Sequence, residues 1–301
     1  MKSMKETLEA DGLLLLVAII WGFAFVAQRS GMDHIGPFAF NGARFALGAL
    51  SLLPVLLLQR RRAREKGGAG HLLPPRQRVL WSAAAGVVLF LAATLQQVGL
   101  AWHSTAGNAG FITCLYVVLV PMAAFLMGRT AGPRIWAGAV LALAGLYVLC
   151  IGSGFALAPG DLLEFIGAFF WAGHILVIGH IGSRMDALEL SIGQFAVCSL
   201  LSTLTAAAIH EPNALSGLRP AIIPILYGGI LSTCVAYTLQ IIGQRKAHPA
   251  HASIIFSMES LFAAIGGVLL LHEPVTFRLV GGGVLMLAGM ISSQLEPAKA
   301  K

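Results

Sequence analysis

The sequence has 301 residues, of which 57% are hydrophobic and only 11% charged, with a formal net charge of +7. Soluble domains carry roughly 25% charged residues, so this composition excludes a water-soluble fold and leaves lipid as the solvent for much of the surface. The positive charge does not indicate nucleic-acid binding, because seven of the 20 Lys and Arg lie between Arg60 and Arg78, beside apolar runs. Such a stretch is typical of a cytoplasmic loop facing anionic lipid.

Ten apolar runs follow one another along the chain, joined mostly by short segments rich in Gly, Pro and Ser. In lipid the backbone must satisfy its own hydrogen bonds, which leaves helices or a closed barrel. The runs are about 20 residues long and do not alternate between polar and apolar residues, so they favour helices. We therefore predict an all-α polytopic membrane protein with ten transmembrane helices. These helices are expected over residues 12–28, 38–58, 79–101, 106–127, 133–151, 162–181, 188–209, 221–242, 250–271 and 275–293.

The sequence repeats itself, first at an offset of 150 residues and later at an offset of 144. The aligned pairs are Asp11 with Asp161, Trp21 with Trp171, Phe45 with Phe195, Gln96 with Gln240, Arg134 with Arg278, Gly138 with Gly282 and Gly145 with Gly289. Each half holds five runs, and because five is odd the second copy is inverted in the membrane. We predict two inverted five-helix repeats, at residues 1–152 and 153–301, an arrangement typical of transporters. The paired glycines predict close packing between helices.

The distribution of Lys and Arg predicts the orientation. With the N-terminus inside, the inner side holds 16 of them and the outer side 3, while Arg44 lies within a helix and completes the 20. The positive-inside rule then predicts a multi-pass protein of the plasma (cytoplasmic) membrane with both termini in the cytoplasm. The first run is open to the alternative of a cleaved signal peptide. Its repeat partner around Trp171 favours a retained membrane helix.

Several stretches match a known pattern across nearly the whole chain. They are Trp21-Gly22, NGARF at 41–45, AGFITCLYVVLVP at 109–121, SMESLF at 257–262, LHEP at 271–274 and GGGVLMLAG at 281–289. With these stretches the chain resembles the EamA-type branch of the drug/metabolite transporter superfamily. The resemblance implies a transporter for amino acids, other metabolites or drugs, which the family usually moves outward.

Arg44 is a candidate substrate-binding residue, because ionisable groups inside a membrane are costly and mark functional sites by default. It lies about 9 Å into its helix at 1.5 Å per residue. Its guanidinium can bind a substrate carboxylate or phosphate in a fork. The alternative is a structural pair with a carboxylate at a helix end, or a side chain that extends to the headgroups.

Glu259 is the candidate coupling residue, since it lies about 14 Å into its helix and close to the bilayer midplane. It is either a proton site or an amine-binding carboxylate, or else a buried acid that helps to pack helices. His248 and His251 lie on the same side of this helix, toward the cytoplasm. We include His251 as a second coupling candidate, because a histidine there can pass a proton between Glu259 and the cytoplasm.

Trp21 and Trp171 are repeat partners about 14 Å deep, although tryptophan prefers the membrane interfaces. They are expected to line a cavity on the pseudo-two-fold axis, or alternatively to pack in the interior. His174 lies near mid-membrane on the face of Trp171, and is either a structural histidine or part of the site. Further polar side chains fall inside helices and can form a wet cavity together or hydrogen-bond helices separately. They are Asn41, Gln96, Gln97, Asn108, Thr113, Tyr116, Tyr237, Thr238 and Gln240, of which all but Gln97, Thr113 and Thr238 are our substrate-binding candidates.

Motifs for other functions are missing from the sequence. There is no GxxxxGK[ST] for an ATP motor, no HExxH or GxSxG for a hydrolase, and no cluster at metal-ligand spacing,. We therefore expect no catalytic residue, cofactor or metal. The four cysteines lie inside apolar runs without CxxC spacing and are expected to be small packing residues.

The predicted function is secondary transport of small metabolites, with amino acids or related compounds as the expected substrates and export as the expected direction. Efflux of drugs or cationic compounds is the alternative, and a membrane-embedded enzyme is a remote one. A channel or sensor is not favoured by inverted repeats. The expected partners are a small-molecule substrate and the lipid bilayer, with no nucleic acid, and the protein is expected as a monomer or a homodimer.

Overall fold

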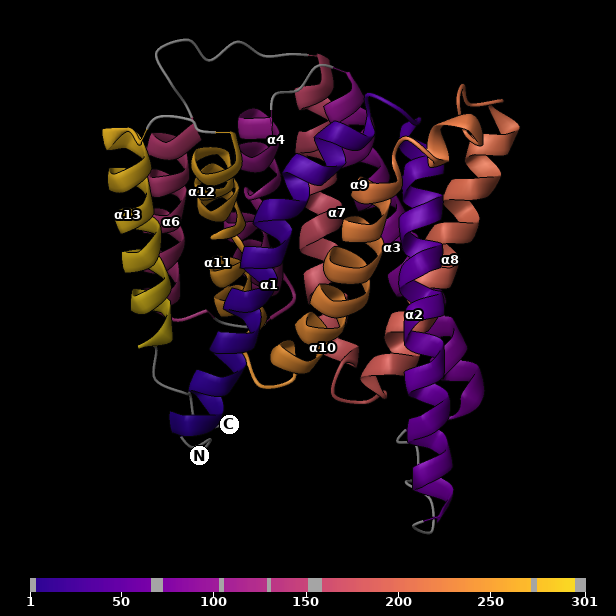
Figure 1. The fold of residues 1–301 in the computed structure, drawn as a ribbon. Helices are drawn as coiled ribbons and strands as arrows, with labels where there is room; N and C mark the ends of the chain where they lie inside the picture. Colours follow the sequence, from indigo (N-terminus) through magenta and orange to yellow (C-terminus); the bar gives the residue numbers. More distant parts are fainter. Residues whose placement is uncertain are drawn as a thin grey trace.

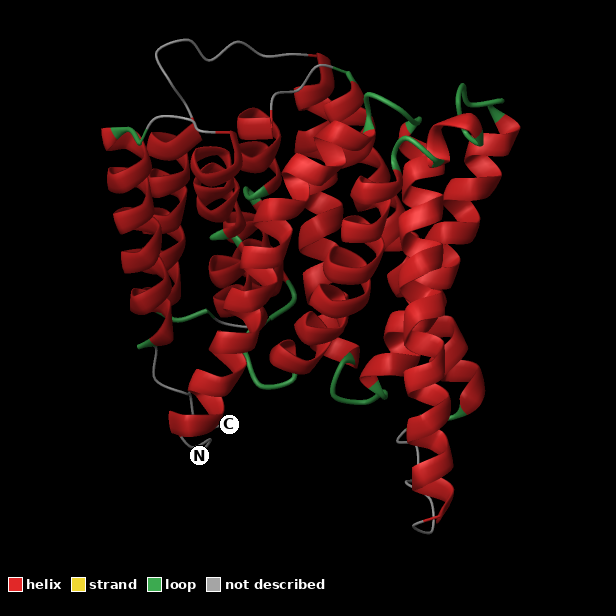
Figure 2. Cartoon of the chain, viewed as in Figure 1, coloured by secondary structure: helices red, strands yellow, loops and turns green. Residues whose placement is uncertain are grey.

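The computed structural model describes residues 4–65, 73–102, 106–128, 131–150, 159–271 and 275–295. All regular structure within these ranges is helical, and the helices run side by side in one bundle (Figure 1, Figure 2). The prediction of an all-α fold is therefore confirmed for this part of the chain.

The first half of the chain forms α1 (Met4–Gly31), α2 (Pro37–Glu65), α3 (Pro75–Ala101), α4 (Ala106–Thr113), α5 (Tyr116–Leu126) and α6 (Pro133–Cys150). The second half forms α7 (Pro159–Ile181), α8 (Ala187–Ala208), the short η1 (Ser216–Leu218), α9 (Ile222–Leu226), η2 (Tyr227–Tyr237), α10 (Thr238–Gln244), α11 (Pro249–Phe256), α12 (Glu259–Leu271) and α13 (Phe277–Gln294). The segments α9, η2 and α10 form one continuous run, of which η2 is π-helical.

Seven helices in the described ranges are long and apolar enough to cross a membrane. They are Glu6–Gly31, Pro37–Arg62, Pro75–Ala101, Ala109–Leu126, Pro159–Ile181, Ala187–Ala208 and Ile222–Gln244. The fifth and tenth predicted runs form shorter apolar helices, Pro133–Val148 and Phe277–Ser293. The ninth run does not form a single helix, because α11 ends at Phe256 and α12 begins at Glu259.

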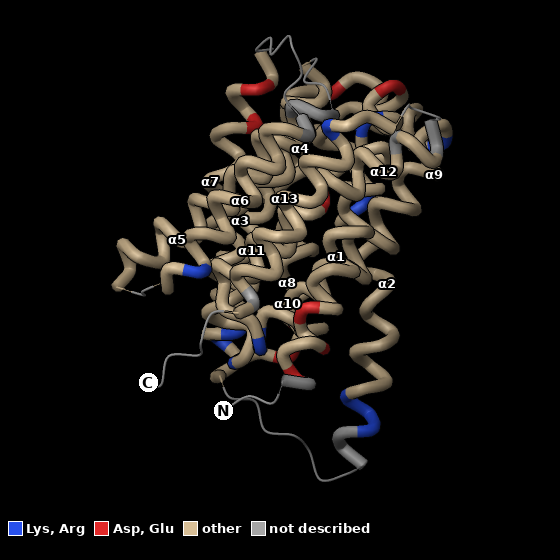
Figure 3. Tube along the Cα trace, turned by 90° about the vertical axis from the view of Figure 1, so that its left-hand side faces the viewer, with Lys and Arg blue, Asp and Glu red and all other residues tan. Residues whose placement is uncertain are grey.

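The surface of the bundle matches a lipid environment. Large apolar side chains such as Leu50, Val79, Phe125, Leu200 and Phe277 point outward and are exposed. Lys and Arg gather mainly near the ends of the bundle (Figure 3). An apolar belt between charged ends is the pattern expected of a multi-pass membrane protein.

The two outer pairs of helices frame the centre of the bundle (Figure 1). At one side α6 packs against α13, and at the other α2 packs against α8. A Cβ atom on Gly138 would lie 2.6 Å from the carbonyl oxygen of Gly289, and a Cβ on Gly289 would lie 2.6 Å from that of Gly138. Gly145 meets Gly282 in the same way, so α6 and α13 are antiparallel. The predicted close packing at these glycines is confirmed.

The helices α4–α5 and α11–α12 are broken at corresponding places. A shift of 144 residues takes Cys114, which lies between α4 and α5, to Met258, which lies between α11 and α12. In the second half the Ser257 hydroxyl donates to the carbonyl of Ile254 at 2.8 Å, a local bond that competes with helix continuation,. The two breaks face each other in the centre of the bundle, where Cys114 Sγ lies 3.1 Å from the hydroxyl of Ser260.

Candidate functional site

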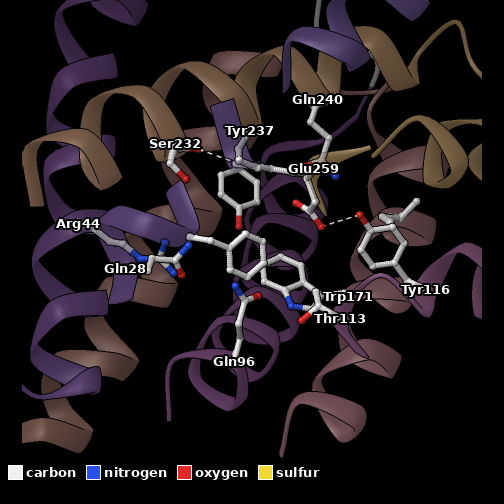
Figure 4. Close-up of a pocket in the computed structure, with 13 residues that line it drawn as sticks. Gln28, Arg44, Gln96, Thr113, Tyr116, Trp171, Ser232, Tyr237, Gln240 and Glu259 are labelled. Carbon is white, nitrogen blue, oxygen red and sulfur yellow. Dashed lines mark hydrogen bonds between the residues drawn. The ribbon is translucent and has the colours of Figure 1, made fainter. Parts of the chain in front are cut away.

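A pocket lies in the centre of the bundle, between helices from both halves of the chain (Figure 4). Its empty space amounts to about 480 Å³, including the part open to solvent. The lining residues are Trp21, Phe25, Gln28, Arg44, Gln96, Thr113, Tyr116, Trp171, Ile175, Ser232, Tyr237, Gln240 and Glu259. From Trp21 the lining follows α1 toward its C-terminal end, so the pocket extends from mid-bundle away from the end that holds the N-terminus.

Aromatic rings form the middle of the pocket, with Tyr237 in contact with several of them. Its ring centroid lies 4.8 Å from that of Trp21 and 6.5 Å from that of Trp171, which is stacked at 19°. The Trp21 indole donates to the carbonyl of Ser232 at 3.2 Å, in the π-helical segment η2. Turns of this π-helical kind are often found at functional sites. Trp21 from the first half of the chain and Trp171 and Tyr237 from the second half together form an aromatic wall of the pocket.

Arg44 lies on one side of the pocket and is only 3% exposed. Its Nε donates to the side chain of Asn41 at 2.9 Å, and Asn41 in turn donates to the carbonyl of Ala93 at 3.2 Å. The guanidinium carbon lies 4.7 Å from the centre of the Phe45 ring and 5.6 Å from that of Phe40. Within the described residues no carboxylate lies within 4 Å of Arg44, so its remaining N–H groups are available to an anionic group in the pocket.

Glu259 lies on the other side of the pocket, as the first residue of α12 (Figure 4). Tyr116 donates its phenol hydrogen to Glu259 Oε1 at 2.8 Å, and Cys114 Sγ lies 3.3 Å from the same oxygen. Within the described residues Glu259 has no Lys or Arg partner. The site thus combines one buried cation and one buried acid that do not neutralise each other.

Two pocket atoms lack hydrogen-bond partners in the described part of the chain. They are the indole nitrogen of Trp171, a donor, and the side-chain oxygen of Gln240, an acceptor. Buried polar groups are almost always paired, so an unpaired one in a native fold needs an explanation. A polar solute in the pocket would supply the missing partners.

The structure brings together eight of the twelve residues proposed from the sequence, namely Trp21, Arg44, Gln96, Tyr116, Trp171, Tyr237, Gln240 and Glu259. Asn41 lies behind Arg44 and orients it. His174 is fully buried and bonded to Gln194 at 2.8 Å, with its ring edge-on to Trp171. The side chain of Asn108 lies outside the described residues.

His251 lies outside the pocket, at the start of α11. Its Nε2 is 3.0 Å from Asp11 Oδ1 and its Nδ1 is 2.8 Å from the Ser293 hydroxyl. This cluster joins α1, α11 and α13 on the side of the bundle that holds the chain termini (Figure 1). Glu259 lies eight positions after His251, so any proton path between them needs intervening water.

The pocket also contains residues that the sequence did not single out. Gln28 and Phe25 follow Trp21 at helical spacings of seven and four residues, and Ile175 follows Trp171 by four. Residues at these spacings share one face of a helix, so the positions of the two tryptophans were the signal that could have identified these neighbours. Ser232 contributes through the π-helical segment, whose spacing no α-helical pattern anticipates.

The cysteines of the described residues fit their expected packing role. Cys114 and Cys198 are buried and Cys234 is half-buried, and all three are free thiols. Cys114 also contacts Glu259 at the edge of the site. The side chain of Cys150 lies outside the described residues.

Comparison with known proteins gives the family. The model of the EamA-like transporter family matches twice, at residues 8–151 and 158–293. An "Uncharacterized transporter" of Archaeoglobus fulgidus is 32% identical over 294 residues, which cover 96% of this chain and 87% of the relative. The "Uncharacterized inner membrane transporter YedA" of Escherichia coli is 27% identical over 308 residues, covering 98% and 95%.

A solved crystal structure has a similar fold, with a TM-score of 0.77 and 20% identity. The similarity covers 94% of this chain and 96% of that chain. The family match spans nearly the whole sequence, and the fold is helical and apolar throughout its described part. The chain therefore belongs to the EamA-like transporter family and is a multi-pass membrane transporter.

Proposed function

We propose that this protein is a secondary transporter that exports amino acids or closely related zwitterionic metabolites across the cytoplasmic membrane. The observation that supports this most directly is that a basic and an acidic side chain line the same pocket without pairing with each other, Arg44 on one side and Glu259 on the other (Figure 4). An amino acid carries the two complementary groups on one carbon. A substrate of this class would satisfy both buried residues at once.

The contacts of the two residues suit these roles. The guanidinium of Arg44 is held by Asn41 through Nε alone, which leaves its outer N–H groups to form a fork around a carboxylate,. Glu259 can accept from an ammonium group with the oxygen that Tyr116 does not engage. The rings of Trp21 and Trp171 would cover the substrate side chain and add cation–π attraction to its amine.

Glu259 also supports coupling to protons. A carboxylate can bind a proton or an ammonium group, but not both at the same oxygen. Substrate binding from the cytoplasm therefore releases a proton, and proton binding from outside releases the substrate. This competition is an antiport, and an inward proton gradient would drive export.

We further propose that ten transmembrane helices form two inverted five-helix repeats, residues 1–152 and 153–301, with both termini in the cytoplasm. The twofold family match, the aligned breaks at Cys114 and Met258, and the reciprocal contact of Gly138 with Gly289 support this arrangement. Inverted repeats can exchange conformations to give alternating access. The pocket then opens toward the outside in the described state.

Efflux of cationic compounds is the second candidate, because aromatic rings and Glu259 alone suffice to bind a cation. A transport assay in liposomes separates the two. Labelled L-leucine is exchanged across the membrane of liposomes that contain purified protein, in competition with 3-methylbutylamine, 4-methylpentanoate or tetraphenylphosphonium. The first two competitors are leucine without its carboxylate and without its amine.

We expect exchange of leucine, and competition by either truncated analogue that is weaker by about tenfold or more, since each lacks one charge-assisted contact. Stronger competition by 3-methylbutylamine and tetraphenylphosphonium than by unlabelled leucine would favour the cation efflux alternative. An absence of exchange with leucine and with a panel of other amino acids would contradict the proposal.

A further inference from the structure

A second buried acid lies next to the pocket. Glu164 on α7 is fully buried and sits seven residues before Trp171, on the same face of the helix,. The hydroxyl of Thr113, a residue of the pocket wall, donates to Glu164 Oε2 at 3.0 Å. Thr113 therefore stands between the open pocket and the enclosed carboxyl group.

The other oxygen of this carboxyl group, Oε1, has no hydrogen-bond partner in the described part of the chain. Two glycines close the space around it. A Cβ atom on Gly99 would lie 2.8 Å from Oε1 and 3.0 Å from the carbonyl oxygen of Gly160. Backbone this close leaves no room for a hydrated metal ion, but a proton needs no room.

Among the described residues, no Lys or Arg lies beside Glu164 on the helices that pack against α7. The helix α10 has no ionisable side chain, and His251 of α11 is bonded to Asp11 and Ser293. Thr113 and the rest of α4 carry no charge, and Tyr116 is the ionisable side chain of α5. Arg76 and Arg78 lie in the first turn of α3, at the opposite end from Gly99. Asp161, one turn earlier on α7, interacts with Glu164 electrostatically and has the same sign of charge. A carboxylate enclosed without a cation is costly, so this group is stable when it holds a proton.

We infer that Glu164 is a second proton-binding site of the transport pocket, reached through the hydroxyl of Thr113. This inference rests on the proposed transport function. A hydronium ion in the pocket gives a proton to Thr113 Oγ1 and becomes neutral water, while Thr113 gives its own proton to Glu164 Oε2. The hydroxyl is restored, and one proton has moved from the pocket to the acid.

The location of Thr113 links the two acids. Thr113 and Tyr116 are one turn apart, on either side of the break between α4 and α5, and each donates to a different carboxyl group. When this break changes shape during transport, both hydrogen bonds change together. Glu164 and Glu259 would thus load and release protons in the same cycle.

The first test needs no substrate. Infrared difference spectra of the purified protein in lipid record the C=O band of neutral carboxylic acids during a pH titration. We compare the parent with Glu164→Gln and Glu259→Gln, and use Thr113→Val against Thr113→Ser as a matched pair that removes or keeps the hydroxyl. Thermal unfolding and gel filtration establish that each variant is folded.

We expect Glu164→Gln to remove one titrating component that Glu259→Gln retains, and Thr113→Val but not Thr113→Ser to shift that component. A spectrum of Glu164→Gln identical to that of the parent would overturn the inference. So would a shift of the Glu164 component by Na⁺ at constant pH, because the site would then bind a metal ion.

The second test measures protons moved per leucine, with a pH-sensitive dye inside the liposomes. Glu164→Gln should keep leucine exchange and lower this ratio about twofold, because one of two proton sites is lost. An unchanged ratio would contradict the inference while leaving the proposed function intact. If the parent does not carry leucine, the proposed function fails, and the infrared titration still decides whether Glu164 binds a proton.

Discussion

Tyr116 and Glu259 join the two halves of the chain by a hydrogen bond of 2.8 Å in the centre of the bundle. Tyr116 is the first residue of α5 and Glu259 the first residue of α12, so each follows the break in its own half. The bond connects Glu259, the proposed proton site, directly to the break between α4 and α5. A change in the charge of Glu259 therefore acts on both breaks.

Tyr116→Phe removes this bond and keeps the ring. We expect a loss of stability of about 1 kcal/mol, the order of an interhelical hydrogen bond. We also expect proton-driven accumulation of substrate to weaken more than exchange, because Glu259 loses its donor. Thermal unfolding in detergent and transport in liposomes measure the two effects. Tyr147→Phe, on the exposed side of α6, is the matched control, and equal effects of the two changes would contradict the role of Tyr116.

Arg44→Lys keeps the positive charge and loses the planar fork. Leucine should compete about tenfold less well, because a bidentate contact becomes a single one. Competition by 3-methylbutylamine, which has no carboxylate, should not weaken. The control is Arg278→Lys, at an exposed position on α13. Equal losses for both compounds would mean that Arg44 supports the fold and not the substrate.

Gly289→Ala places a methyl group 2.6 Å from the carbonyl oxygen of Gly138. The helices α6 and α13 must then move apart, which we expect to cost about 1–3 kcal/mol in stability. Gly281→Ala on the same helix is the control, since its nearest contact is Val148 at 4.0 Å. Thermal unfolding should show a lower midpoint for Gly289→Ala alone. Similar midpoints for both variants would exclude close packing as the role of these glycines.

His251→Gln tests the proposed proton path on the cytoplasmic side. Gln can keep one hydrogen bond to Asp11 or Ser293 but cannot take up a proton. We expect proton-driven accumulation to slow several-fold while substrate exchange continues. His34→Gln, at an exposed position after α1, serves as the control. Accumulation at the parent's rate would show that the cluster of Asp11, His251 and Ser293 only ties three helices together.

The sequence predicted the helical membrane fold because apolar runs of this length permit little else in lipid. It also predicted most of the residues that line the pocket, since Arg44 and Glu259 are ionisable and costly inside a membrane, and Trp21 and Trp171 are repeat partners far from the interfaces that tryptophan prefers. The breaks after Thr113 and Phe256 were not predicted, because neither Pro nor Gly lies in them and single Ser or Thr residues also occur inside continuous membrane helices,. The π-helical turn at Ser232 was not predicted either.

Glu164 shows a different limit of sequence reasoning. It lies six residues into α7, where an acid near a helix N-terminus is usually an exposed charge favoured by the helix dipole,. Its burial depends on Gly99 of α3, far away in the sequence, and the hydrogen bond that it receives within the described part of the chain comes from Thr113. For His251 the sequence suggested the wrong neighbour. Its position on the helix predicted a link to Glu259, but its hydrogen-bond partners are Asp11 and Ser293, which come from the two ends of the chain.

The most direct test of the account is accumulation of labelled leucine by liposomes under an imposed pH gradient, in the parent and in Glu259→Gln. Gln resembles the neutral acid in shape but cannot release a proton. We predict that the parent concentrates leucine on the acidic side, whereas Glu259→Gln still exchanges leucine but concentrates it much less, since at most the Glu164 site still carries a proton. Accumulation by Glu259→Gln equal to that of the parent, or a parent that ignores the pH gradient, would contradict proton-coupled transport through this pocket.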